Sequence, residues 1–341
     1  MSLKKAEELI KKHKIFLITT HLNPEADGIG AELAFLYLLR KLGKHGFIIN
    51  ESKVPAECEF LPGINYIQPL SRKTKRKKFD CAVFVDCAEI LRSPKVAELI
   101  KGKPILNIDH HRSNTRFASV NPALLKNNGV DNKKGGVNWI EANASSTCEM
   151  IYRLYRKLKV PVDKDAALML YAGITIDTGS FHYSNTSAST HRIAASLIEK
   201  GISVPAVYHK LFENSSFQAL RLLGRILLTV EHDASGRIAW VIIPESIPGQ
   251  ELPSVDMAEA VLGLLRSIKQ VELAIIFKEV YGKKNQVRIN FRSQTKFDCN
   301  KLASYFGGGG HRNASGARTE GNLSEVKIKV IQCAKKMMGD A

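Results

Sequence analysis

The sequence lacks any apolar run that approaches the roughly 20 residues a helix needs to cross a bilayer. It also lacks a Cys-x-x-Cys pair, and several of its six cysteines sit inside apolar segments, as buried thiols do. We therefore expect no membrane partner, no thiolate zinc site and a reducing, cytoplasmic location. Residues 1–10 have the spacing of an amphipathic helix rather than of a signal peptide.

Acidic residues are the scarcer charge. The chain has 33 Asp and Glu against 50 Lys and Arg, which leaves a formal net charge of +17. This excess favours an anionic partner such as a nucleotide or a nucleic acid. A generic basic surface is the alternative, because the densest basic run, residues 72–78, contains no aromatic residue and is typical of a solvated loop.

The length of 341 residues, of which 44% are hydrophobic, predicts two packed domains. Apolar runs at 14–20, 79–85 and 104–106 are typical of buried strands, and segments with helical spacing lie between such runs. The pattern changes after Gly201. We expect an α/β fold with a parallel-sheet domain at 1–200, a helical connector at 201–230 and a smaller mixed α/β domain at 231–341.

Acids or histidines follow each of these three runs. Asp109-His110-His111 follows the third run, Asp86 follows the second, and a loop with His21 and two acids follows the first. Ligand sites in parallel sheets lie at the carboxyl ends of the strands, so the repetition predicts a shared site. Taken alone, the Asp-His-His stretch fits a chance cluster in a surface loop equally well.

The candidate groups are rich in carboxylate oxygen, include imidazole and lack sulfur. Neighbouring carboxylates raise one another's pKa unless cations compensate, and such donors suit manganese or magnesium better than structural zinc. Two metals about 3.5–4 Å apart activate water and stabilise a phosphoryl-transfer transition state. Unrelated helix caps and salt bridges are the alternative. The candidate side chains are those of His21, Glu25, Asp27, Asp86, Asp109, His110, His111 and Asp177.

Four motifs carry a resemblance to a known family. They are His21-x-Asn23-Pro24-Glu25-x-Asp27, Asp86 after an apolar run, Asp109-His110-His111, and Asp177-Thr178-Gly179. With the glycine run 307–310 and the histidine after it, they resemble the DHH phosphoesterase superfamily and its associated C-terminal domain, over nearly the whole chain. The resemblance is closest to the NrnA type, which cleaves short oligoribonucleotides and often dephosphorylates 3′-phosphoadenosine 5′-phosphate (pAp).

This resemblance implies two divalent cations, most readily Mn²⁺, with Mg²⁺ or Co²⁺ as alternatives. It assigns one metal to His21, Glu25 and Asp86, and the other to Asp27, Asp86, His110 and Asp177. Asp86 would thus bridge the pair. His111 would face the scissile phosphate, and Asp109 would orient an imidazole from behind.

The resemblance places most substrate contacts in the second domain. Glycines let a backbone approach phosphate closely, although a glycine run alone would also suit a flexible hinge. Arginine suits bidentate phosphate binding, and Asn114 is a candidate whose alternative is a solvated loop. The implied substrate-binding residues are Arg292, Ser293, Gly308, Gly309, Gly310, His311 and Asn114.

The expected activity is two-metal hydrolysis of short single-stranded RNA, of pAp, or of both, to nucleoside monophosphates. The resemblance also suggests a homodimer. Glu25 stands where the family usually has Asp. The alternatives are a linear or cyclic dinucleotide phosphodiesterase, or a catalytically weakened nucleotide- or nucleic-acid-binding protein.

Overall fold

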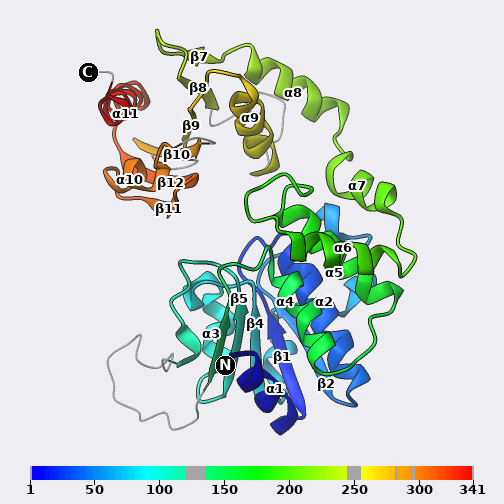
Figure 1. Cartoon of the computed structure of the whole chain (residues 1–341). Helices are drawn as coiled ribbons and strands as arrows, with labels where there is room; N and C mark the ends of the chain where they lie inside the picture. Colours follow the sequence, from blue (N-terminus) through cyan, green and yellow to red (C-terminus); the bar gives the residue numbers. More distant parts are fainter. Residues whose placement is uncertain are drawn as a thin grey trace. The chain divides into compact units, whose positions relative to one another are not determined.

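The computed structural model describes residues 2–119, 136–243, 255–280, 283, 285–293 and 296–339, with the side chains of 255, 256 and 311 outside this description (Figure 1). The chain forms two compact units, Met1–Asn214 and Ser215–Ala341. The division falls inside 201–230, and the domain bounds given above stay predictions. None of the described helices is long and apolar enough to cross a membrane.

A six-stranded, all-parallel sheet forms the centre of the first unit, with strand order β3-β2-β1-β4-β5-β6. This confirms the parallel α/β domain that the apolar runs predict. The chain order reverses between β1 and β4, and ligands bind at such switch points outside the carboxyl ends of the strands. The strands are β1 Ile15–Thr19, β2 His45–Asn50, β3 Ile67–Pro69, β4 Cys81–Val85, β5 Ile105–Asp109 and β6 Val137–Ile140.

Helices pack on both faces of this sheet. Helices α1, α2, α4 and α5 share one large apolar cluster with the sheet, and α3 belongs to a second cluster built on Leu17, Ala82 and Phe84. The sheet core is therefore closed on both sides, and its strand ends are left to carry polar groups. The helices are α1 Ser2–Lys12, α2 Ala26–Lys41, α3 Pro94–Leu99, α4 Thr147–Lys157, α5 Lys164–Asp177, α6 Ala188–Ile198 and α7 Val204–Phe212, with short 3-10 helices at Ala56–Cys58, Ile64–Tyr66, Thr74–Arg76, Ile90–Arg92 and Phe117–Ser119.

The second unit is a mixed sheet with order β11-β12-β10-β9-β8-β7, in which only β8 and β9 pair in parallel. Helices α10 and α11 cover one face, and α8 and α9 pack on β8 and β9 on the other. This confirms the predicted mixed α/β domain, in which β9 and β10 pair antiparallel. The elements are α8 Phe217–Leu227, β7 Glu231–His232, β8 Ile238–Ile243, α9 Val255–Ser267, β9 Leu273–Glu279, β10 Gln286–Ser293, α10 Cys299–Ser304, β11 Gly309–His311, β12 Ala314–Glu320 and α11 Leu323–Met338.

Candidate two-metal active site

Asp86 lies at the centre of the candidate site, directly after β4. Its φ of 53° is in the left-handed region, which costs a non-glycine residue about 1–3 kcal/mol and is often found at functional sites. Its carboxylate lies 3.6 Å from Nε2 of His21, 3.6 Å from Nε2 of His110 and 3.6 Å from Nδ1 of His111. The structure thus brings together groups that follow three different strands.

Two sets of donor atoms are close enough to hold metal ions. One set is Asp86, His110 and His111, the other is Asp27, His110 and Asp177, and the donor atoms within each set lie within 4.8 Å of one another. His110 belongs to both sets, and its Nε2 lies 3.2 Å from Oδ2 of Asp177. The two overlapping sets therefore mark one cluster of side chains that could hold metal ions.

The N-terminus of α4 holds Asp27 in place. Both carboxylate oxygens accept backbone hydrogen bonds, Oδ2 from the N–H of Thr147 at 2.7 Å and Oδ1 from the N–H of Cys148 at 2.8 Å. Helix N-termini stabilise negative charge because their first N–H groups have no partner within the helix. Each oxygen keeps a further lone pair, which leaves Asp27 able to bind a cation.

The pKa values of the carboxylates at this site shift in opposite directions: those of Asp27 and Asp177 rise and that of Asp86 falls. Burial and the neighbouring Asp86 raise the pKa of Asp27 to about 6. Burial also raises the pKa of Asp177 well above its usual range, although His110 opposes the shift. Burial acts on Asp86 in the same direction, but the surrounding imidazoles of His110, His21 and His111 together outweigh burial and hold the pKa of Asp86 well below the ordinary value.

This donor set suits divalent cations. Oδ2 of Asp177 is buried and makes no hydrogen bond within the described residues. The carboxylates of Asp27, Asp86 and Asp177 repel one another when ionised, unless a cation is bound between them. The cluster also offers imidazole nitrogens and no sulfur ligand. Oxygen-rich sites with some nitrogen donors are typical of manganese and magnesium.

Two family models match this chain: the model described as the DHH family, N-terminal domain, covers residues 15–174, and that of the DHHA1 domain covers residues 246–336. The first unit carries a DHH domain, and the second carries a DHHA1 domain. The "Bifunctional oligoribonuclease and PAP phosphatase NrnA" of Thermus thermophilus is 27% identical over 326 residues, 94% of this chain and 89% of that protein.

Two further proteins are similar to this chain. The "Probable manganese-dependent inorganic pyrophosphatase" of Streptococcus mutans is 25% identical over 183 residues, 53% of this chain and 54% of that protein. The crystal structure of an exopolyphosphatase-related protein from Bacteroides fragilis has a TM-score of 0.81 at 23% identity and covers 98% of this chain and 95% of its own. The latter shows that the two chains share the same fold.

The third residue of the DHH stretch is held by the first. Nδ1 of His111 lies 2.7 Å from Oδ1 of Asp109, which is fully buried, and Nδ2 of Asn114 donates to Oδ2 of the same carboxylate at 2.5 Å. Burial lowers the pKa of His111, but the bond to Asp109 and the charges of Asp86 and Asp109 together outweigh burial, and the net shift of the pKa is upward. Asn114 thus has a supporting contact, and its predicted contact with phosphate stays a prediction.

His21 and Glu25, which follow β1, lie outside the two donor sets. Nδ1 of His21 lies 2.7 Å from the backbone oxygen of Leu22 and 3.1 Å from Nη2 of Arg92. Glu25 is exposed and forms the N-cap position of α2. Neither side chain belongs to the two donor sets above, so their assignment as metal ligands stays a prediction.

Thr147 and Arg92 contribute to the DHH site although no sequence motif points to them. Oγ1 of Thr147 donates to Oδ1 of Asp86 at 3.3 Å and is buried. Ser146, whose side chain accepts from the N–H of Glu149, is a recognisable helix start. That signal predicts where α4 begins, but not which side chain its N-terminus faces.

The second unit uses its glycines for close packing. A Cβ at Gly308 would lie 2.2 Å from the backbone oxygen of Gly316, and Gly310 has a φ of 145° with the oxygen of Ala314 at 2.6 Å from a Cβ. Gly309 is less confined, since the nearest atom to its Cβ would be Oδ1 of Asn300 at 3.6 Å. The side chain of His311 lies outside the described part of the chain.

Arg292 and Ser293 lie at the end of β10. The guanidinium of Arg292 pairs with the carboxylate of Glu259 through Nη2 and through Nε, the latter at 3.3 Å. Ser293 is 1% exposed, and its backbone N–H donates to the oxygen of Asn313. Their roles as phosphate contacts stay predictions.

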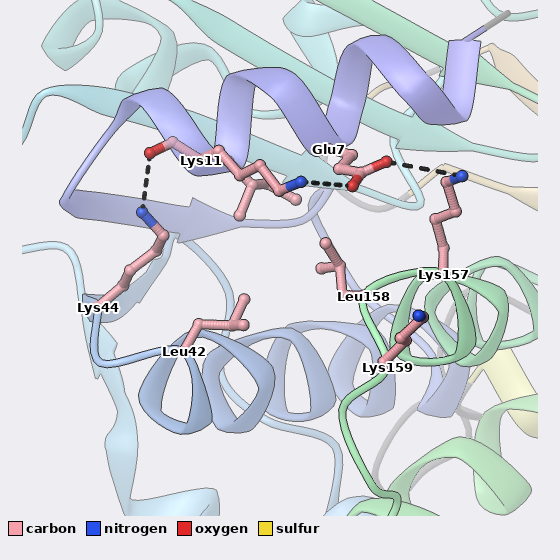
Figure 2. Close-up of a pocket in the computed structure, with 8 residues that line it drawn as sticks. Glu7, Lys11, Leu42, Lys44, Lys157, Leu158 and Lys159 are labelled. Atoms are coloured by element: carbon pink, nitrogen blue, oxygen red, sulfur yellow. Dashed lines mark hydrogen bonds and ion pairs between the residues drawn. The ribbon is translucent and has the colours of Figure 1, made fainter.

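A hollow of about 440 Å³ lies elsewhere on the first unit, where α1, α2 and α4 end (Figure 2). Figure 2 shows Lys11 and Lys157 paired with Glu7, at 2.7 Å and 3.9 Å, and Lys44 bonded to the backbone oxygen of Lys11 at 3.2 Å. Cations near helix C-termini stabilise the helix dipole. These lysines are engaged in the packing of the fold, and the hollow is separate from the DHH site.

Proposed function

We propose that this protein is a metal-dependent phosphoesterase that hydrolyses short oligoribonucleotides, pAp, or both, to nucleoside monophosphates. The observation that carries the proposal is the convergence of two donor sets that share His110, formed by Asp27, Asp86, His110, His111 and Asp177. The NrnA relative, which is named for these two activities and aligned over 94% of this chain, supports the choice of substrates.

The metal assignment is part of the proposal. His21, Glu25 and Asp86 would hold one divalent cation, and Asp27, Asp86, His110 and Asp177 the other, with Mn²⁺ favoured by the manganese-dependent relative. When bound, two such cations lower the pKa of a water molecule and neutralise charge on the phosphoryl group. The left-handed backbone of Asp86 and the α4 amides on Asp27 hold these two carboxylates in place before any ion binds.

His111 would act on the substrate from the side of the DHH stretch. Its bond to Asp109 places the Nδ1 proton toward that carboxylate, and Nε2 is the nitrogen that would face the substrate. The upward pKa shift favours the protonated ring, which can donate a hydrogen bond to a phosphate oxygen. Arg292, Ser293, the glycines 308–310 and His311 would hold the nucleotide.

The location and assembly of the protein are proposed on narrower grounds. Five of the six cysteines are buried and none forms a disulfide among the described residues, which supports a reducing, cytoplasmic location. A homodimer is the assembly that we propose. Light scattering of the purified protein tests the dimer, and a monomeric mass would exclude it.

Comparison of three substrates tests the function. We expect a ribonucleotide dimer and pAp to yield nucleoside monophosphate with Mn²⁺ and to remain intact with chelator. Preferential cleavage of a linear adenylate dinucleotide derived from cyclic di-AMP would support a dinucleotide phosphodiesterase instead. Absence of any product with Mn²⁺ would exclude an enzyme and leave a nucleotide-binding protein.

A further inference from the structure

A row of three cations crosses adjacent strands of the second unit. Lys278 of β9 stands opposite Arg288 of β10, which stands opposite Arg318 of β12. Residues directly opposite in antiparallel strands project from the same face with Cβ atoms about 4.5–5.5 Å apart. The ion pairs found among the described residues of this unit include none of the three.

This row is electrostatically unfavourable in the unbound protein. Burial and the charge of Arg318 lower the pKa of Arg288, and burial and the charge of Arg288 lower the pKa of Lys278. Like charges directly opposite one another destabilise a sheet. An anion bound over the row would remove the repulsion.

Within the described residues, Arg288 and Arg318 are exposed on the face that carries the row, where β10 and β12 pair. Alternate residues of β10 are buried under α10 and α11, so Arg288, Asn290 and Arg292 share the other face. Gly316 and Ala314 of β12 stand opposite Asn290 and Arg292. Among the described residues, a Cβ at Gly316 would meet one atom within 4 Å, the backbone oxygen of Ile289 at 3.2 Å, so a ligand backbone can approach the sheet there.

At one end of this face, Arg292 forms an ion pair with the carboxylate of Glu259. The guanidinium of Arg292 pairs with both carboxylate oxygens of Glu259, and the same planar fork binds phosphate. Arg288 lies four residues along β10, a span of about 13 Å. The cation row is therefore separate from the predicted phosphate contact at Arg292.

We propose that Lys278, Arg288 and Arg318 form a second phosphate subsite, which binds the sugar–phosphate backbone of oligoribonucleotides longer than the dimer. This inference rests on the proposed function and specifies how that function would extend to longer substrates. It predicts that the three cations act on chain length and leave the reaction itself unchanged.

A charge-neutral double variant tests the subsite. Arg288→Gln with Arg318→Gln removes two charges and keeps most of each side chain, and Lys329→Gln with Lys336→Gln on α11 is the matched control on the opposite face. We expect kcat/KM with Mn²⁺ to fall about tenfold for a pentaribonucleotide and less than about twofold for a dimer. The dependence of log kcat/KM on log salt should become shallower by about 1.4 for the pentamer, because each phosphate contact to a single strand contributes about 0.7.

Three outcomes would overturn the proposal. Wild-type pentamer kinetics in the double variant would show that the row binds no phosphate. An equal fall in kcat/KM for the dimer would mean that the arginines act at the reacting phosphate. An equal fall for the pentamer in the control variant would mean that net charge alone causes the effect. If the wild-type protein hydrolyses neither RNA, the proposed function fails, and fluorescence anisotropy with a labelled pentamer in chelator tests the row alone: unchanged affinity in the double variant would reject it.

Discussion

Asp109 is fully buried and reaches the candidate site only through His111, so its contribution is to position that ring. We predict that Asp109→Asn lowers kcat about 10–100-fold, the range for loss of such a supporting contact, with a smaller change in KM. The variant should also move the alkaline limb of kcat to lower pH, because Asp109 raises the pKa of His111. A pH–rate profile measures both effects.

The matched control is Asp165→Asn, an exposed acid in the first turn of α5. It should behave as wild type in the same profile. An unchanged alkaline limb in Asp109→Asn, together with a normal kcat, would show that His111 does not depend on its bond to Asp109.

At the scale of elements, a buried polar contact joins α2 to β2. Nδ2 of Asn50 donates to Oε2 of Glu32 at 2.8 Å, and burial raises the pKa of Glu32 from 4.5 to about 8. Between these values the folded state holds a proton that the unfolded chain releases, so this group's contribution to stability falls as pH rises.

Glu32→Gln removes that titration. We predict that the free energy of unfolding of the variant, relative to wild type, rises between pH 5 and pH 8. Urea unfolding in chelator at both pH values measures the difference. The same pH dependence in both proteins would show that Glu32 is ionised throughout the range in the folded state.

The pairing of β11 with β12 depends on Gly310, where the backbone leaves no room for a side chain. We predict that Gly310→Ala destabilises the second unit by about 1–3 kcal/mol, since an alanine there must keep a φ of 145° and meet a backbone oxygen 2.6 Å away. Gly309→Ala is the control and should change stability by less than about 0.5 kcal/mol. Denaturant unfolding checks both, and equal stability of the two variants would mean that the strands separate to admit the side chain.

At the scale of the whole molecule, the two units have separate apolar cores, and every predicted metal ligand lies in the first. A ligand that binds only the folded form raises the melting temperature of that form. We predict two thermal transitions. Mn²⁺ should raise the melting temperature of the first unit and leave that of the second unchanged within error. In Asp86→Ala neither should respond to Mn²⁺, and a shift retained in that variant would remove Asp86 as the shared ligand.

The amino-acid sequence by itself determined the parallel sheet and the strand-end positions of Asp86 and the Asp109-His110-His111 stretch. Continuous apolar runs are local signals, and the carboxyl ends of parallel strands meet at one edge whatever the details of packing. The same local signals predicted the mixed sheet of the second unit. They could not show that Asp109 and Asn114 would be joined beneath His111, since the turn after β5 decides which side chains face each other.

The packing of whole elements determines which distant groups support the site. The α4 amides that hold Asp27 lie 120 and 121 positions after it in the chain. The side chain of Thr147 contacts Asp86, which lies 61 positions before it. The row of Lys278, Arg288 and Arg318 exists only through the register of three strands, because a shift of one residue would turn these side chains to the other face. Local patterns encode periodicity and chain reversal, whereas register and helix placement result from the packing of whole elements.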